Sequence, residues 1–239
     1  MCGRFALKST LDQLAQIFGA QAAHQTSSQA PSQTSHHISE GERWDWAGSY
    51  NISPASVIPV LAFDGQKRKK LVPMRWGLHP HWKRTRPEGR PLFNARLETA
   101  REKASFRTPY QKRRALIPVS GWYEWEGVSK PKTPYYIYEK NTPIFAFAGL
   151  WDQWRVEEGI TLLSCTVLTT SATAPIDHLH HRMPVRLPRA AWEGWLDPDQ
   201  KAKEVLVQAG EAPELAYHAV GRDINSGQAR GAELIERIS

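Results

Sequence analysis

Residues 114–125 read Arg-Ala-Leu-Ile-Pro-Val-Ser-Gly-Trp-Tyr-Glu-Trp, and most of these side chains are apolar, β-branched or aromatic. Such a composition is typical of buried β-strand. Similar runs lie on both sides and are separated by glycine, proline or clustered charge; they are residues 57–63, 70–78, 134–138, 144–154 and 162–169. The sequence therefore predicts a protein built mainly from sheet.

Helical patterns are fewer. In residues 9–19 a capping box of Thr10 and Gln13 precedes apolar residues at helical spacing, and Gly19 ends the pattern. Weaker helical patterns cover residues 97–106, 190–196, 199–209 and 231–238. Because strands outnumber helices and do not alternate with them, we expect a single α+β domain with a mostly antiparallel sheet or barrel core and peripheral helices.

Composition limits the classes of function. The chain has 239 residues, of which 41% are hydrophobic, so a full core can form. Its two cysteines, Cys2 and Cys165, exclude a disulfide scaffold and indicate a reducing compartment. No signal peptide and no apolar run long enough to span a membrane is recognisable. We expect a cytoplasmic protein, associated with the nucleoid and not with a membrane.

Positive charge is concentrated in one part of the chain. The net charge is +7, and residues 67–114 hold 16 Lys or Arg against three acids, Glu88, Glu98 and Glu102. A field of this sign favours a polyanion such as nucleic acid, and the ten tryptophans could stack on unpaired bases. A solvated basic face that keeps the protein soluble is the alternative.

Cysteine at the second position suggests a reactive amino terminus. If Met1 is removed, Cys2 carries an amine and a thiol on adjacent carbons, and both have a reactive fraction near neutral pH. Such an aminothiol forms a Schiff base with an aldehyde and then closes to a thiazolidine ring. The alternative is that Cys2 is simply a small buried residue, as we expect for Cys165.

Three other segments place polar side chains among apolar ones. Asn94 could bind a ligand or cap the helix that follows it. Glu124 lies among three aromatic residues, where a carboxyl has a raised pKa and can act as a general acid, unless it is an exposed residue on the outer strand face. The histidines of segment 177–184 do not have the ligand spacing usual for a zinc site. A histidine that transfers protons, with Arg182 binding a phosphate, explains the segment better than a metal site does. We expect no metal and no cofactor.

Six motifs in order resemble one family. They are Met-Cys-Gly-Arg-Phe at 1–5, Tyr-Asn-Ile-Ser-Pro at 50–54, Arg-Trp-Gly-Leu at 75–78, Asn-Ala-Arg at 94–96, Gly-Trp-Tyr-Glu-Trp at 121–125 and His-His-Arg-Met-Pro at 180–184. The chain resembles the SRAP (SOS-response-associated peptidase) family of abasic-site processing proteins. The resemblance implies an SRAP domain over residues 2–230. Residues at about 21–43, rich in Gln, Ser, Ala and His, are expected to form a low-complexity surface insertion.

The family resemblance implies a covalent reaction with single-stranded DNA that contains an abasic site. Cys2 would be the nucleophile that forms the thiazolidine, Asn94 would orient its amine or the opened sugar, Glu124 would transfer protons, and His180 would assist ring opening. The implied DNA contacts are Arg4, Trp76, Arg96, Trp125 and Arg182. The peptidase activity in the family name would be limited to removal of the chain's own leading residue.

Two other classes of function stay open. An N-terminal-nucleophile peptidase or amidase would share Cys2 but would need no basic aromatic surface. A non-catalytic single-strand DNA-binding module would need that surface but not Cys2. We expect a monomer, because no long apolar helix face or heptad pattern is left over.

Overall fold

The computed structural model describes residues 2–22, 44–85, 87–127, 131–155, 161–210 and 212–238. The insertion predicted at 21–43 lies outside the described residues except for Gln21 and Ala22, which form the short strand β2 (Gln21–Ala22). No helix of the described part is long and apolar enough to cross a membrane.

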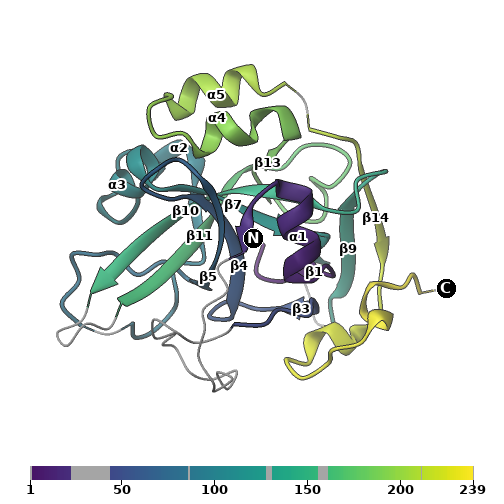
Figure 1. The fold of residues 1–239 in the computed structure, drawn as a ribbon. Coiled ribbons are helices and arrows are strands. Elements are labelled where there is room, and N and C mark those ends of the chain that lie inside the picture. The colour runs from purple at the N-terminus through teal and green to yellow at the C-terminus, as the bar shows by residue number, and fades with distance from the viewer. Residues whose placement is uncertain are drawn as a thin grey trace.

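Five strands close into a barrel, as the sequence predicted (Figure 1). They are β4 (Val57–Phe63), β5 (Lys69–Trp76), β7 (Arg114–Val119), β10 (Phe145–Arg155) and β11 (Thr161–Ser171). Neighbours in the order β5-β4-β7-β10-β11 are antiparallel, and a parallel contact of Ser164 with Arg75 and Cys165 with Trp76 closes the ring. Short strands extend this sheet: β2 beside β5, β6 (Asn94–Arg96) and β12 (Arg182–Pro184) beside β11, and β13 (Arg186–Leu187) beside β10.

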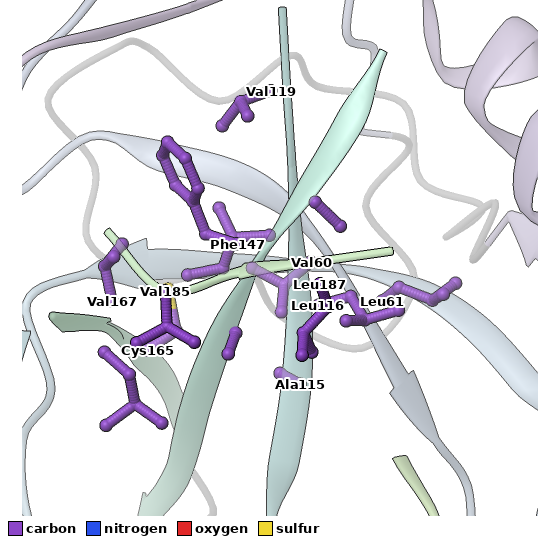
Figure 2. Packing of buried hydrophobic residues seen from close by; sticks show 14 of the residues in the cluster. Val60, Leu61, Ala115, Leu116, Val119, Phe147, Cys165, Val167, Val185 and Leu187 are labelled. Atoms are coloured by element: carbon purple, nitrogen blue, oxygen red, sulfur yellow. The ribbon is translucent and has the colours of Figure 1, made fainter. Parts of the chain in front are cut away.

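The barrel strands carry much of the core. Figure 2 shows side chains of the β4, β7, β10 and β11 strands meeting there, among them Leu61, Leu116, Phe147 and Cys165. Cys165 is fully buried, as predicted, and burial raises the pKa of its thiol. The continuous apolar runs of the sequence thus correspond to strands with little exposed surface.

A second sheet of five strands lies against the barrel. Its order is β14 (Leu215–Ala219), β9 (Thr133–Glu139), β8 (Gly121–Glu126), β1 (Phe5–Leu7) and β3 (Ser49–Ile52). The run 114–125 is therefore two strands, β7 in the barrel and β8 in the second sheet, and the chain crosses between the sheets at Ser120. The backbone N–H of Ser120 donates to the Ala6 carbonyl at 2.7 Å, which fixes this crossing against β1.

The first helix forms where the sequence predicts it. In α1 (Leu11–Phe18) the Gln13 backbone N–H donates to the Thr10 hydroxyl and the Gln13 side chain accepts from the Thr10 N–H, which completes the capping box. Gly19 ends the helix in the left-handed region, with φ of 57°. Its apolar face is buried against the core and includes a stacked contact between Phe18 and Trp192.

The other helical predictions need adjustment. The pattern 97–106 forms two helices, α2 (Leu97–Ala100) and α3 (Ala104–Lys112), because the chain becomes extended at Lys103 and a new helix then buries Phe106. The helix predicted at 231–238 is instead a single 3₁₀ turn, Ala232–Ile235. The remaining elements are the 3₁₀ turn Arg189–Ala191, α4 (Trp192–Leu196), α5 (Ala202–Gln208) and the 3₁₀ turns Arg222–Asn225 and Ala232–Ile235. In Figure 1, α4 and α5 lie together at the top and α2 and α3 at the left.

The crossing between the two sheets depends on Gly121, which gives a testable prediction. A Cβ atom at this position would lie 2.6 Å from the Ile137 carbonyl oxygen and would also overlap the Tyr136 ring. We expect Gly121→Ala to lower the free energy of unfolding by at least about 2 kcal/mol in urea denaturation. Gly65→Ala is the matched control, since nothing lies within 4 Å of its added Cβ. Equal stability of the two variants would contradict the packing described here.

Candidate functional site

Cys2 lies inside the protein, just before β1. Its side chain is fully buried, and the Asn94 side-chain amide donates to the Cys2 backbone carbonyl at 2.7 Å. Asn94 is the first residue of β6, which pairs with β11 through the Asn94–Val167 register. Asn94 is not a helix cap, because the N-cap position of α2 is Arg96. The amide thus fixes the backbone of the first residues of the chain.

Glu124 is buried in the second sheet, so the alternative of an exposed outer-face residue is wrong. Glu124 is 4% exposed and lies on β8, which pairs with β9 on one side and with β1 on the other. Burial raises the pKa of the Glu124 carboxyl from 4.5 to about 7. The carboxyl can therefore both donate and accept a proton near neutral pH.

Cys2 and Glu124 lie close enough to influence one another. The backbone N–H of Tyr123 donates to the Arg4 carbonyl at 2.9 Å, so the chain before β1 continues along β8 toward Glu124. Burial raises the pKa of the Cys2 thiol, and the negative charge of Glu124 raises it further. The thiol is therefore protonated until a base removes its proton, and Glu124 is a carboxylate whose charge acts on it.

His180 is held in its neutral form. Burial lowers its pKa to about 4, and the positive charge of the chain's amino terminus acts in the same direction. The Arg182 backbone N–H lies 2.9 Å from His180 Nδ1 and the Arg182 carbonyl oxygen lies 3.1 Å from the same nitrogen, so the Arg182 backbone holds the ring in place. The same amino-terminal charge also acts on Glu124, which places both side chains in the electrostatic field of the chain's beginning.

The loop with His180 is fastened to the strand with Asn94. The Arg182 guanidinium forms a bidentate ion pair with the Glu98 carboxylate, at 2.8 Å for each bond, and also donates to the Thr169 carbonyl. Glu98 follows β6 in α2 and Thr169 is in β11, so this one side chain joins three elements. The structure therefore brings Cys2, Asn94, Glu124 and His180 into one region, although they come from distant parts of the sequence.

Two of the five predicted DNA contacts, Trp76 and Arg182, are buried and do not suit that role, and Arg4 is half-buried and bonded within the protein. Trp76 is fully buried, with its ring 4.8 Å from that of Phe5 and its indole N–H donating to the Phe93 carbonyl. Arg182 is 8% exposed, and its guanidinium is paired with the Glu98 carboxylate. The Arg4 guanidinium donates to the Asn51 side chain and the Ile224 carbonyl. These side chains hold the protein's own segments together.

Arg96 and Trp125 remain available. Arg96 is exposed at the end of β6, two residues after Asn94. Trp125 follows Glu124 on β8, is half-buried and donates its indole N–H to the Asn225 side chain at 2.8 Å. Both side chains therefore reach the surface within two residues of a buried site residue.

Sequence reasoning missed two residues near the site. Asn51 accepts from Arg4 and donates to the carbonyls of Ser226 and Ala229, at 2.9 and 2.8 Å, so it ties the amino-terminal segment to the carboxyl-terminal one. Tyr135 lies directly opposite Glu124 on β9. Asn51 lies within the motif at 50–54, which was the only signal for it. Within the described ranges, no three His, Cys, Asp or Glu side chains come together as metal ligands would.

The fold and the site define a class of mostly-sheet proteins in which a buried cysteine at the second position lies just before the first strand. A buried carboxyl and a neutral histidine lie in the same region. The chain belongs to the SOS response associated peptidase (SRAP) family, whose family model matches residues 1–227.

Relatives and solved structures agree with this assignment. The chain is 35% identical over 240 residues to the abasic site processing protein YoqW of Bacillus subtilis (strain 168), covering 99% of both chains. It is 30% identical over 197 residues to the abasic site processing protein YedK of Escherichia coli (strain K12), covering 80% of this chain and 85% of YedK. A crystal structure of a Bacteroides thetaiotaomicron protein has the same fold, with a TM-score of 0.78 over the whole of both chains at 22% identity.

The raised pKa of Glu124 predicts how stability depends on pH. Between pH 4.5 and about 7 the folded protein keeps a proton that the unfolded chain has lost. Stability is therefore highest below this window and falls as pH rises through it, by an amount on the order of 1–3 kcal/mol. Glu124→Gln cannot ionise, so we expect it to lose less stability than the wild type between pH 5 and pH 8, measured by urea denaturation. Parallel loss in both proteins would show that the carboxyl is not buried as described.

Proposed function

We propose that this protein binds single-stranded DNA at an abasic site and captures the ring-opened sugar aldehyde covalently through Cys2. The observation that carries the proposal is the position of Cys2, whose backbone is held by Asn94 and whose thiol lies in the field of the buried Glu124. The relatives YoqW and YedK are named abasic site processing proteins, which supports the same substrate.

The proposed reaction begins after Met1 is removed and the Cys2 amine is free. The amine attacks C1′ of the open-chain aldehyde and gives a carbinolamine. Glu124, protonated in part at neutral pH because its pKa is about 7, donates a proton to the hydroxyl, and water leaves to form the imine. This step forms the C1′–N double bond and leaves Glu124 as a carboxylate.

Ring closure follows on the same carbon. The carboxylate of Glu124 accepts the proton of the Cys2 thiol, and the sulfur adds to C1′ of the imine, whose nitrogen still carries the remaining proton of the amine. The ring nitrogen is then N–H, and Glu124 is protonated again. The whole sequence releases one water molecule and forms one C–N and one C–S bond. Because the thiazolidine has no imine, the β-elimination that would cut the DNA strand is suppressed. The resulting cross-link shields the lesion.

The remaining side chains position the sugar. Burial lowers the pKa of His180 to about 4, so a neutral His180 would assist opening of the sugar hemiacetal. Asn94 keeps the Cys2 backbone in place through its bond to the carbonyl. Exposed Arg96 can pair with a backbone phosphate, and Trp125 can stack on a neighbouring base. Hydrolytic self-removal of Met1 belongs to the same proposal, since Glu124 can protonate the departing Cys2 amine.

Intact mass spectrometry tests the proposal. The purified protein should lack Met1 and should gain the mass of an oligonucleotide that carries one abasic site, less one water, in a product that survives heating. Cys2→Ala should form no such product. Cys2→Ser keeps the amine, so we expect strand cleavage and an imine that borohydride traps. A protein that retains Met1, or one that lacks it and forms no adduct, would remove the covalent mechanism.

The role of Glu124 has a separate test. Glu124→Gln should slow cross-linking by roughly 100-fold, as expected when a general acid–base group is lost, while the dissociation constant for plain single-stranded DNA stays within about twofold of wild type, since this site is not a phosphate contact. Glu126→Gln, two residues along the same strand, is the matched control and should cross-link at the wild-type rate. Equal losses of rate and affinity in Glu124→Gln would indicate a structural role instead.

A further inference from the structure

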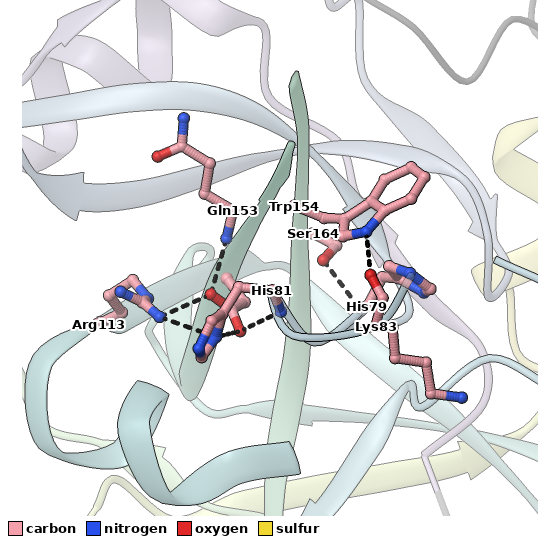
Figure 3. Close-up of polar contacts among 8 residues, drawn as sticks. His79, His81, Lys83, Arg113, Gln153, Trp154 and Ser164 are labelled. Carbon is pink, nitrogen blue, oxygen red and sulfur yellow. Dashed lines mark hydrogen bonds and ion pairs between the residues drawn. The ribbon is translucent and has the colours of Figure 1, made fainter. Parts of the chain in front are cut away.

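A second polar cluster lies in the barrel wall, away from Cys2. Its centre is the Asp152 carboxylate of β10, which is completely buried, and Figure 3 shows the residues His81, Arg113 and Gln153 that contact it. Arg113 Nη2 lies 2.7 Å from Asp152 Oδ1, and the Gln153 backbone N–H donates to the same oxygen at 2.8 Å. Asp152 Oδ2 accepts from both the backbone N–H of His81, at 3.0 Å, and its ring Nδ1, at 2.9 Å. Four donors therefore fix this carboxylate.

The cluster orients His81 toward solvent. Because Nδ1 faces Asp152, the opposite ring nitrogen, Nε2, points away from the buried carboxylate, and the side chain is 42% exposed. Within the described part of the chain, no side chain or backbone group bonds to Nε2. Arg113 lies beside the ring, with Nη2 3.3 Å from His81 Nδ1, and is itself 25% exposed. An imidazole and a guanidinium thus stand next to each other at the surface.

The surrounding loop is basic and firmly attached. Its described parts, 79–85 and 87–91, lie between Leu78 and Leu92, which pair with each other, and carry the exposed cations Lys83, Arg84 and Arg90. The Trp154 indole N–H donates to the Lys83 carbonyl at 2.6 Å, and Ser164 accepts from the His79 backbone N–H at 2.9 Å (Figure 3). Such anchoring prepares the surface before a ligand binds.

The loop that carries His81 is attached to the same barrel strand, β11, as the strand that carries Asn94. Asn94 follows the loop by two residues after Leu92, and its partner on β11 is Val167. Ser164, which anchors the loop, precedes Val167 by three residues, a separation of about 10 Å along a strand. The loop with His81 and the short strand with Asn94 are therefore attached to neighbouring parts of β11.

We propose that His81 and Arg113 bind a backbone phosphate of the DNA strand next to the abasic nucleotide, with Asp152 as the positioning residue. The inference rests on the proposed function and adds a contact on one side of the lesion. A phosphate oxygen accepts hydrogen bonds, and an imidazole with protons on both nitrogens donates Nδ1–H to Asp152 and Nε2–H to the phosphate. Arg113 adds a guanidinium donor, the group best matched to phosphate.

The test uses His81→Asn. The amide nitrogen of asparagine can replace Nδ1 as donor to Asp152, so the loop stays anchored, but the outward nitrogen is lost. We expect the variant to bind a long oligothymidylate roughly fivefold more weakly than wild type, with the slope of log K against log salt smaller by about 0.7, as for one lost phosphate contact on a single strand. Its melting temperature should match the wild type. Lys203→Ala, an exposed cation on α5, is the control and should change neither value.

Two further readouts keep this proposal separate from the covalent one. Oligothymidylate has no abasic site, so the binding result is independent of any cross-linking. At saturating abasic DNA, wild type and His81→Asn should cross-link at equal rates, because the covalent step does not involve His81. If His81→Asn binds the long strand with wild-type affinity and salt slope, His81 serves only to anchor the loop and the proposal is wrong.

Discussion

Burial of the Glu124 carboxyl between β1 and β9 is the constraint on which the site depends. An ionised carboxylate without water is costly, so burial raises the pKa of Glu124 to about 7 and both of its protonation states are populated at neutral pH. The same burial raises the pKa of the Cys2 thiol and keeps it protonated. Glu124 is therefore suited to the proposed role, in which it first gives a proton and then takes one from the thiol.

The crossing at Ser120 and Gly121 makes this burial possible. One continuous apolar stretch supplies β7 to the closed barrel and β8 to the second sheet, so Glu124 is carried from the barrel wall into contact with the amino-terminal segment. Asn94 and His180 reach the same region because β6 and β12 both pair with β11. The Arg182–Glu98 ion pair then holds those two additions together. Rigid sheet thus positions the side chains that sequence distance separates.

Local patterns predicted much of the fold because they depend on local physics. The strand at 57–63 and the capped helix after Thr10 follow from β-branched composition and from a side chain bonding its own backbone. Glu124 could be selected because three aromatic neighbours implied an apolar surrounding. The direction in which a side chain points could not be predicted from local sequence. Trp76 points into the core, and Arg182 pairs with Glu98, 84 residues away. The Asp152–His81 cluster joins residues 71 positions apart and has no local signal.

The central claim is that both functional groups of Cys2 are joined to the sugar. Proteolysis of the cross-linked product followed by tandem mass spectrometry tests this most directly. The account predicts that the sugar is on the peptide that begins with Cys2-Gly3-Arg4, that its amine resists acylation and that its thiol resists alkylation. A sugar attached to a lysine side chain, or to a Cys2 peptide whose thiol is still free to react, would contradict the account.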